Sequence, residues 1–416
     1  MARARRLSLA QRPRRIPVNL HGWLGSKVGR LVLVLAVALA ATACDKMGAE
    51  NKGGGGGSAD KGTGPIVVGH YASMTGAQAT FGQSTDKGIR LAIEERNAAG
   101  GVKGRKIELK TLDDAGKQTE AATAVTRLIN DSHAVAILGE VASSLSLVGG
   151  PIAQKNKVPM ISPSSTNPDV TGVGDMVFRV CFLDSFQGYV NAKFARDNLK
   201  ATKAAILYDQ AQAYSSGLAA DFKKAFTELG GTIVAEQAYT GGNLEVSSQL
   251  QSIKGAGAEV VFLPGYYSDV GTIIRKAREG GISQPFLGGD GWDSVELAKI
   301  AGDAINGNYY SNHYSHEEQR PEVQNFVAAY GKKYGGEVPD GLAALGYDAA
   351  MLLFDAMERA PSLGGTDLAA AIAATKDFKG VTGTFSIDEH RNAKKSAVIL
   401  EYKDGVPTMA ARIEPQ

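Results

Sequence analysis

The stretch Pro65–Gly101, PIVVGHYASMTGAQATFGQSTDKGIRLAIEERNAAGG, decides the fold of this chain. Its first part, Ile66–His70, is short and rich in β-branched residues, which is typical of a strand. Its second part, Phe81–Ala98, is an amphipathic stretch that ends at Gly100 and Gly101, which is typical of a helix stopped by glycine. The stretch therefore predicts a strand followed by a helix.

The same alternation continues through the first half of the chain. A regular order of strand, helix and strand predicts a parallel sheet with helices on both faces. The further elements predicted here are the strands Lys106–Leu112, Ala134–Leu138 and Met160–Ser162 and the helices Thr119–Asp131 and Ser144–Asn156.

The alternation then starts again, which predicts a second, similar lobe. About 350 residues are enough for two lobes. Long helices are predicted within residues 321–374, and the chain is predicted to close with the strands Thr384–Ile387 and Ala397–Tyr402. The other predicted elements are the strands Ala204–Tyr208, Thr232–Tyr239, Val260–Leu263 and Pro285–Gly288 and the helices Phe186–Leu199, Tyr214–Leu229, Leu244–Ala256 and Asp269–Glu279.

Residues 1–43 predict a secretory signal peptide. They contain eight Arg and Lys residues and no acidic residue, and the apolar run Leu31–Ala43 follows these charges. A basic start, a short apolar core and small residues at its end are typical of such a signal. The run is too short to span about 30 Å of hydrocarbon as a helix.

Cys44 follows the small residues Ala41–Ala43 and resembles a bacterial lipoprotein cleavage site, although Leu is more common than Ala at position 41. We expect lipidation of Cys44, and the alternative is plain cleavage to a free periplasmic protein. Acyl chains hold a protein at a membrane because each buried CH₂ contributes about 0.8 kcal/mol. Residues 45–64 contain eight glycines, including Gly53–Gly57. They predict a flexible linker with a reach of about 25 Å.

The charge of the mature chain excludes one class of partner. Loss of the leader removes eight of the 45 Lys and Arg and leaves 37, against 43 Asp and Glu, so the net charge becomes −6. An acidic chain lacks the basic face that nucleic acids require. Cys181 is the one cysteine besides Cys44, so no disulfide within the chain is expected.

The first lobe offers donors for an anion. Ligands of open α/β sheets bind beyond the carboxyl ends of the strands. Ser143 and Ser144 follow one predicted strand at the start of a helix, where a hydroxyl can cap the helix and free N–H groups can bind a carboxylate. Ser164 and Thr166 lie in the loop after the next strand. The alternatives are an ordinary helix cap and a solvated turn.

The second lobe offers groups that suit an ammonium ion. Tyr214, Tyr266, Asp290 and Trp292 all follow predicted strands. Aromatic faces and a carboxylate together can hold an ammonium group. The alternatives are core or rim aromatic residues and, for Asp290, a turn residue.

Sequence motifs give little support to an enzyme. The chain has no dinucleotide-binding glycine motif, P-loop, nucleophile elbow or His-Glu-x-x-His sequence. His313 and His316 are three residues apart without a nearby cysteine, so a solvated loop is favoured over a metal site. We therefore expect no catalytic residue, no cofactor and no metal.

Several short motifs follow one another along the chain. They are Met74-Thr75-Gly76, Asn97-Ala98-Ala99-Gly100-Gly101, Asp113-Asp114, Ile161-Ser162-Pro163, Thr166-Asn167-Pro168, Leu183-Asp184-Ser185 with Gln187-Gly188, and Gly265-Tyr266 with Gly271 and Arg275. Together they resemble the leucine/isoleucine/valine-binding proteins of bacterial ABC transporters, and the resemblance covers nearly all of residues 65–416.

The resemblance implies the type I periplasmic-binding fold, an α/β architecture of two doubly wound parallel-sheet lobes joined by three crossover segments. Crossings are then expected near Ser185, Gly307 and Phe385. The first lobe would consist of residues 65–185 and 308–384. The second lobe would consist of residues 186–307 and 385–416.

The resemblance also implies roles for site residues. The ligand carboxylate would bind Ser143, Ser164 and Thr166, and the ligand ammonium would pair with Asp290, where Glu is common in the family. Two cysteines that some relatives bridge are replaced by Gly116 and Ala142. The other implied ligand-binding residues are Tyr214, Tyr266 and Phe81, where some relatives have Tyr.

These expectations together predict a monomeric, extracytoplasmic solute-binding protein that is anchored through Cys44 in the periplasm or at the outer face of the cytoplasmic membrane. It would capture a small amino acid, with a branched-chain one favoured, and deliver it to the permease subunits of an ABC transporter. Two alternatives stay open. The same fold could bind amides, urea or aromatic acids, or it could act as a ligand-sensing lobe.

Overall fold

The computed structural model describes residues 62–415. The predicted signal peptide, Cys44 and most of the predicted linker 44–64 lie outside the described residues. None of the helices within residues 62–415 is long and apolar enough to cross a membrane.

The first lobe is built on a five-stranded parallel sheet with the strand order β2-β1-β3-β4-β5. Ile66 and Val68 of the first strand are fully buried, as expected for a strand that has helices on both faces. The strands are β1 (Ile66–Ala72), β2 (Ile107–Asp113), β3 (Ala136–Leu138), β4 (Met160–Ser162) and β5 (Val177–Arg179).

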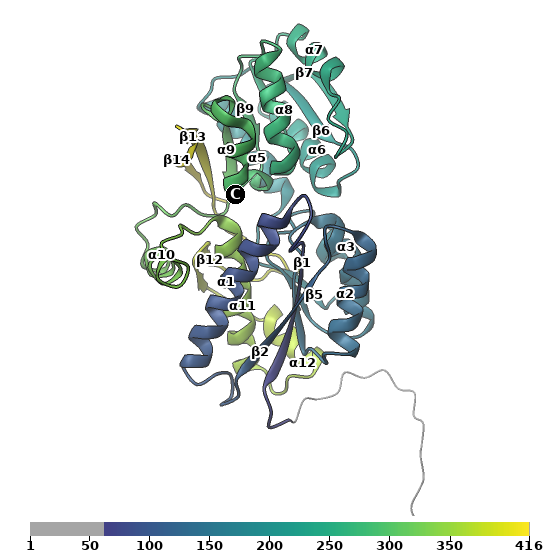
Figure 1. Cartoon of the computed structure of the whole chain (residues 1–416), viewed down its shortest axis with the longest axis vertical. Coiled ribbons are helices and arrows are strands. Elements are labelled where there is room, and N and C mark those ends of the chain that lie inside the picture. The colour runs from purple at the N-terminus through teal and green to yellow at the C-terminus, as the bar shows by residue number, and fades with distance from the viewer. Residues whose placement is uncertain (1–61, 416) are drawn as a thin grey trace, which may run out of the picture. The chain divides into compact units, whose positions relative to one another are not determined.

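Helices cover both faces of this sheet, with α1 and α11 on one face and α2 and α3 on the other (Figure 1). α1 and α11 pack closely because of glycine: a Cβ on Gly88 would lie 2.0 Å from the carbonyl oxygen of Ala343. The helical region predicted at 321–374 consists of three separate helices. The helices of this lobe are α1 (Ala79–Ala98), α2 (Gln118–Asn130), α3 (Ser143–Lys155), α4 (Asp169–Gly172), α10 (Pro321–Lys333), α11 (Gly341–Arg359) and α12 (Gly365–Ala373).

The second lobe is built on a seven-stranded sheet with the strand order β14-β13-β10-β9-β8-β6-β7. Its five parallel strands repeat the order of the first sheet, and β13 and β14 are antiparallel. The strands are β6 (Lys203–Asp209), β7 (Thr232–Tyr239), β8 (Val260–Phe262), β9 (Phe286–Gly288), β10 (Tyr309–Asn312), β13 (Ala397–Lys403) and β14 (Val406–Ile413).

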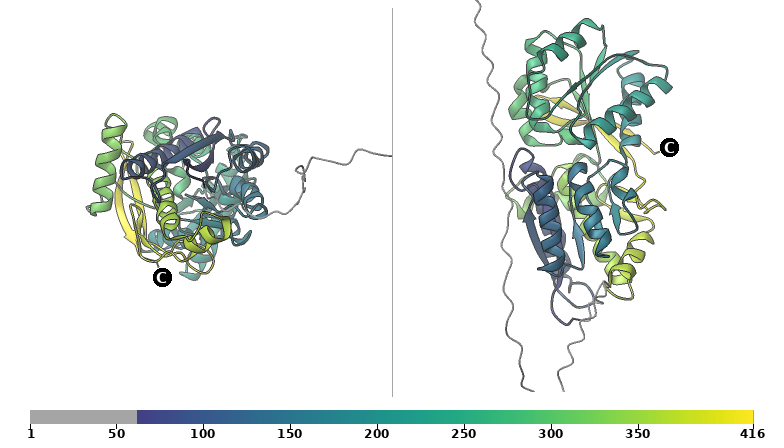
Figure 2. Two further views of the ribbon diagram at one scale, coloured as in Figure 1. Left: turned by 90° about the horizontal axis from the view of Figure 1, so that it is seen from below. Right: turned by 90° about the vertical axis from the view of Figure 1, so that its right-hand side faces the viewer.

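Helices on both faces of the second sheet complete this lobe, and the two lobes are seen one above the other in Figure 1 and in the right-hand view of Figure 2. The helices are α5 (Asp184–Asp197), α6 (Ala213–Glu228), α7 (Ser247–Gly255), α8 (Tyr267–Glu279), α9 (Val295–Ala301) and the 3₁₀ helices η1 (Asp290–Trp292) and η2 (Gly302–Ile305). The fold is the type I periplasmic-binding fold predicted from the sequence.

The chain passes between the lobes at three places within the described residues: between β5 and α5, between β10 and α10, and between β12 (Gly383–Phe385) and β13. β12 pairs with β11 (Phe378–Gly380) in a separate hairpin. One strand departs from the expected lobe boundary. β10 lies within residues 308–384, which the sequence assigned to the first lobe, but it pairs with β9 and β13 of the second sheet. The glycine turn at Gly307, with φ of 72°, precedes β10 and does not end the lobe.

Candidate functional site

The candidate site lies between the lobes, beyond the carboxyl ends of the parallel strands of both sheets. The first lobe supplies Phe81, Val141, Ser164 and Leu342 to a cavity there, and the second lobe supplies Tyr214, Tyr266, Asp290 and Gly291. The space among these side chains is about 10 Å³, which is room for about one water molecule. The lobes are therefore closed on each other.

Hydrogen bonds across the cleft show the same closure. The Thr80 hydroxyl lies 2.9 Å from the Ser294 hydroxyl. Ser144 donates from Oγ to the amide oxygen of Gln212 at 3.1 Å. Asn167 donates from Nδ2 to the carbonyl oxygen of Ala213 at 2.9 Å. Each pair joins one residue of the first lobe to one of the second.

Asp290 is the only carboxylate among the residues that line the cavity. It begins the short helix η1 after β9, and only 5% of its surface is exposed. Its Oδ1 accepts hydrogen bonds from Gln187 Nε2 at 2.9 Å and from the Tyr214 hydroxyl at 2.8 Å. Its Oδ2 lies 3.0 Å from Nε2 of His313. These contacts fix the carboxylate in the wall of the cavity.

His313 binds Asp290 as a neutral imidazole. Burial lowers the pKa of His313 from 6.5 to about 4, and the hydrogen bond to Asp290 only partly opposes this shift. At neutral pH the ring therefore donates its Nε2–H without bringing a positive charge. With His313 neutral, Asp290 has no cationic partner within residues 62–415.

Three aromatic rings surround the rest of the cavity. Tyr214 and Tyr266 stack with ring centroids 5.3 Å apart, and Phe81 meets Tyr266 edge to face at 5.7 Å. The Tyr266 hydroxyl and Ser164 Oγ are buried, and neither has a hydrogen-bond partner within residues 62–415. A buried polar group without a partner is costly, so both hydroxyls are suited to bind a polar ligand.

Ser143 and Thr166 lie beside the cavity rather than in its wall. Ser143 Oγ accepts a hydrogen bond from the Asn167 N–H at 3.3 Å and so joins the two loops of the first lobe. Neither Ser143 nor Ser144 caps α3 with its side chain, because the cap position is Ala142. Thr166 lies next to Asp184, whose pKa is raised well above 3.8 by burial, with an opposing contribution from the Thr166 hydroxyl.

Comparison with known proteins decides the family. The family model described as "Periplasmic binding protein" matches residues 65–406. The chain belongs to the periplasmic binding protein family. The "Leu/Ile/Val-binding protein homolog 3" of Brucella melitensis is 31% identical over 347 residues, which are 82% of this chain and 92% of the relative. The resemblance seen in the sequence is thereby confirmed.

Solved structures agree with this assignment. A leucine-binding protein of Thermotoga maritima has a TM-score of 0.81 and 40% identity, and the match covers 84% of this chain and 99% of the other. A branched-chain amino-acid substrate-binding protein of Streptococcus pneumoniae, in complex with isoleucine, has a TM-score of 0.80 and 32% identity, with 84% and 100% coverage. Family membership places the protein outside the cytoplasm.

The structure places Trp292 of this periplasmic binding protein away from the cavity. Its indole is fully buried and donates from Nε1 to the carbonyl oxygen of Leu263 at 3.0 Å. It fills the space beside Gly288, where a Cβ would lie 2.0 Å from the ring. The reason is local: within the single turn of η1, Asp290 and Trp292 point in different directions.

Several residues of the binding protein's cavity were not predicted. Val141 and Leu342 supply apolar wall, and Gly291 fits because a Cβ there would lie 2.5 Å from the carbonyl oxygen of Gly265. Gln187 was noted only as part of a family motif. His313 was assigned to a solvated loop, but it is 3% exposed and contacts Asp290. In the sequence, His313 is seen only as a histidine in an otherwise polar turn, and this pattern does not indicate that the residue is buried.

No group of three or more His, Cys, Asp or Glu residues within 62–415 is arranged to hold a metal ion. Cys181 is buried and free. Burial raises the pKa of its thiol to about 12, which leaves it protonated and unreactive at neutral pH.

Proposed function

We propose that this protein captures a branched-chain amino acid between its two lobes and delivers it to an ABC transporter. The observation that carries the proposal is the placement of Asp290 in the second-lobe wall of the cavity, opposite the unpaired Ser164 hydroxyl of the first lobe. An α-amino acid has a cationic and an anionic end, and these two walls complement both.

Different groups of the protein hold the ammonium, the carboxylate and the side chain of the ligand. Its ammonium group pairs with Asp290, whose hydrogen bonds from neutral donors leave the negative charge in place. Its carboxylate meets the first-lobe loops that contain Ser143, Ser164 and Thr166. Its side chain lies among apolar groups, including Phe81 and Leu342.

Closure of the lobes links binding to recognition by the transporter. A ligand shifts an open–closed equilibrium only by its differential affinity for the two states. Because one lobe binds the ammonium and the other the carboxylate, both ends are satisfied only in the closed state. The closed cavity of about 10 Å³ also means that the lobes must part before an amino acid enters.

The printed names of the relatives support the choice of ligand. They include a leucine-binding protein, a protein in complex with isoleucine, and a leucine-, isoleucine-, valine-, threonine- and alanine-binding protein of Pseudomonas aeruginosa that is 30% identical over 331 residues. A protein from Rhodopseudomonas palustris, 27% identical, is in complex with 3,4-dihydroxybenzoic acid. Such an acid has no cation for Asp290, which disfavours that alternative here.

We also propose that the protein binds its ligand without catalysis and that it is located at the membrane. The protein releases its ligand unchanged to the permease subunits. Cys44 carries the lipid anchor, and the glycine-rich linker lets the two lobes reach the transporter while they stay close to the membrane. Mass spectrometry of Cys44 in the membrane fraction tests the anchor, and an unmodified, soluble N-terminus contradicts it.

Isothermal titration with matched ligands tests the function. Leucine, isoleucine and valine are compared with 4-methylpentanoate, which lacks the ammonium of leucine, and 3-methylbutylamine, which lacks its carboxylate. Leucine should bind at least 100-fold more tightly than either analogue, because each loses one charge-paired end. Equal binding of 4-methylpentanoate would remove Asp290 from the site and reopen the aromatic-acid alternative.

A further inference from the structure

A contact between the lobes lies beside the ligand cavity, at the start of α11. Asp293 follows η1 in the second lobe, and its Oδ2 accepts a hydrogen bond from the N–H of Gly341 in the first lobe at 2.6 Å. The backbones approach closely because residue 341 is glycine. A Cβ there would lie 2.5 Å from Oδ1 of Asn312, which also belongs to the second lobe. The contact therefore exists only when the lobes are closed.

A second carboxyl, from the first lobe itself, caps the same helix. Asp340 is the N-cap residue of α11, and its Oδ1 accepts a hydrogen bond from the N–H of Ala343 at 2.8 Å. Ser84 of α1 donates to the same oxygen from its hydroxyl. Two carboxyls, one from each lobe, thus bind the first turn of α11.

Negative charge on both carboxyls is unfavourable when the lobes are closed. Burial, followed by the charge of Asp293, raises the pKa of Asp340 from 3.8 to about 7. Burial also raises the pKa of Asp293, which is 7% exposed, and its hydrogen bonds oppose the rise. Neighbouring carboxyls in one buried place share a proton. The closed pair therefore holds about one proton near neutral pH.

Other titratable groups around the pair leave it without a cationic partner. Burial raises the pKa of the four tyrosines among them, so their hydroxyls stay neutral near pH 7. Lys87 forms an ion pair with Glu337 instead. Repulsion within the pair is therefore relieved by a proton. The surrounding groups are Lys87 on α1, Asp290 on η1, Tyr310 on β10, Tyr314 and His316 in the second crossing, Tyr330 on α10, Glu337 before α11 and Tyr402 on β13.

A cavity of about 300 Å³ gives water access to the pair. Asp293 and Asp340 both line this cavity. Val295 lines it too, and because its side chain is 68% exposed, the cavity reaches the surface. Protons can therefore enter and leave the pair through water.

The same part of the second lobe also holds the apolar wall of the ligand cavity. Gly341 is bound across the cleft, and the next residue, Leu342, lines the ligand cavity. Ser294 contacts Thr80 across the cleft at 2.9 Å, and the next residue there, Phe81, lines the ligand cavity as well. Loss of the contact at Gly341 therefore displaces wall that surrounds the ligand.

We propose that Asp293 and Asp340 are positioning residues that form a proton-dependent latch between the lobes. When the lobes close, the pair takes up about one proton, and the latch holds the start of α11, with Leu342, against the ligand side chain. When the lobes part, water surrounds both carboxyls and the proton is released. Ligand capture is thereby favoured in a mildly acidic medium. The inference rests on the proposed function, because it needs a ligand that closes the lobes.

Proton uptake on leucine binding is the readout that a merely structural contact would not give. At pH 6.5 the closed form holds the proton and the open form lacks it, so each binding event should take up about 0.5–0.8 proton. Isothermal titration in phosphate and in imidazole buffer, whose ionisation enthalpies differ, measures this number. The leucine Kd should fall about threefold to tenfold from pH 8 to pH 6. His313 can contribute only with the opposite sign, because burial lowers its pKa.

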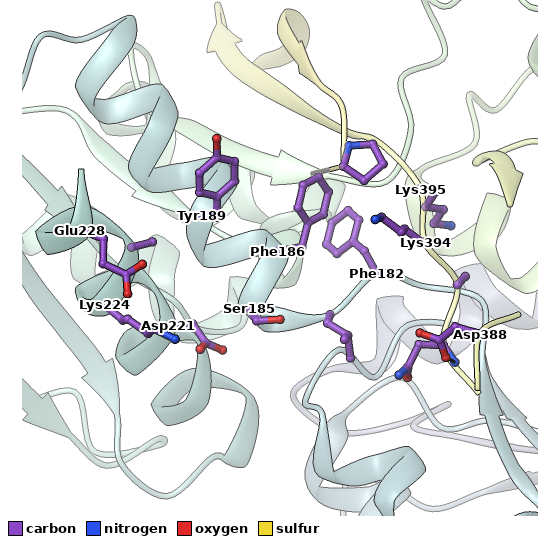
Figure 3. Close-up of a pocket in the computed structure, with 15 residues that line it drawn as sticks. Phe182, Ser185, Phe186, Tyr189, Asp221, Lys224, Glu228, Asp388, Lys394 and Lys395 are labelled. Carbon is purple, nitrogen blue, oxygen red and sulfur yellow. Dashed lines mark hydrogen bonds between the residues drawn. The ribbon is translucent and has the colours of Figure 1, made fainter. Parts of the chain in front are cut away.

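The variant Asp340→Asn separates the proton from the structure. Asparagine caps a helix as well as aspartate does, and it resembles the protonated acid. The variant should therefore bind leucine at pH 8 as tightly as the wild type does at pH 6, without proton uptake. His316→Gln, in the same cavity, should keep the wild-type uptake. So should Asp221→Asn, because Asp221 also has a raised pKa but lines a separate pocket at the first and third crossings (Figure 3).

The variant Gly341→Ala tests the latch without a change in any titratable group. The added Cβ has no room against Asn312 in the closed form, so leucine should bind about tenfold more weakly. Gly255→Ala on α7 is the matched control, because nothing lies within 4 Å of a Cβ there. Equal proton uptake in the wild type and Asp340→Asn, or none in the wild type, would overturn the latch alone. No binding of leucine at any pH would overturn the proposed function, and the latch with it.

Discussion

Each lobe has a buried carboxylate just after a central parallel strand, and the two have different environments. Glu140 follows β3 of the first lobe, and Asp290 follows β9 of the second. Glu140 accepts the Ser73 N–H at 3.0 Å and the Ala142 N–H, and it lies near the carboxyl of Asp114. Asp290 accepts hydrogen bonds from the side chains of Gln187 and Tyr214. The two strands are not equivalent, because β9 corresponds to β4 of the first sheet and β3 corresponds to β8 of the second. Glu140 holds backbone groups of its own lobe, whereas we propose that Asp290 binds the ligand.

Burial also affects the protonation of Glu140. The pKa of Glu140 is raised well above 4.5, first by burial and then by the charge of Asp114. The environment of Glu140 thus favours the neutral acid, which suits a group that holds a loop. A neutral acid in the place of Asp290 would not attract an ammonium ion. The hydrogen-bond partners differ accordingly: backbone N–H groups bind Glu140, and side chains bind Asp290.

The largest effect is expected for Asp290→Ala. This variant should weaken leucine binding by about 2–5 kcal/mol, because one partner of a buried charge pair is removed. Isothermal titration measures the change. Glu140→Gln is the matched control, and its leucine Kd should stay within about twofold of the wild type. An unchanged Kd in Asp290→Ala would remove this residue from the site.

The next effect concerns His313 and acid stability. Between pH 6.5 and pH about 4 the unfolded chain binds a proton on this histidine that the folded protein excludes. The stability due to the neutral ring is therefore complete above pH 6.5 and is lost as the pH falls, by roughly 3 kcal/mol in total. Urea unfolding at pH 7.5, 5.5 and 4.5 should show a smaller loss in His313→Gln than in the wild type. The exposed-histidine variant His390→Gln should show the full loss.

A smaller effect of opposite sign is expected for Glu140→Gln. The folded protein keeps the Glu140 proton at pH values where the unfolded chain has released it, because the folded pKa is raised. Wild-type stability should therefore fall as the pH rises above about 4.5, by up to about 1.4 kcal/mol per pH unit. The variant should lack this contribution, so its free energy of unfolding should rise relative to the wild type from pH 5 to 7. If the free energies of unfolding of the wild type and the variant changed in parallel with pH, this would contradict a neutral Glu140 in the folded protein.

The sequence predicted the fold well where local patterns are strong. Ile66–His70 is an apolar run and became the core of β1 (Ile66–Ala72). β14 (Val406–Ile413) was missed because its side chains are mostly half-buried or exposed and give no clear alternation.

The site was predicted less completely, for two physical reasons. A strand end locates Asp290, but it does not tell which way the side chains of the following turn point, so Trp292 was included although it lies in the core. Leu342 begins a helix of the first lobe far along the chain. Only the return of the chain through the second crossing brings it beside Phe81 and Val141 in the cavity.

The smallest effect is expected for Ser164→Ala, on the lobe opposite Asp290. The buried hydroxyl has no partner within residues 62–415, so the substitution should cost little stability or even raise it. Leucine binding should weaken by about 1–2 kcal/mol, because a hydrogen bond to the ligand carboxylate is lost. Thermal unfolding with and without leucine separates the two effects, since a bound ligand raises stability by mass action. A variant that loses stability without ligand, and binds leucine as the wild type does, would show that Ser164 supports the loop instead. The carboxylate would then depend on the backbone N–H groups at the start of α3.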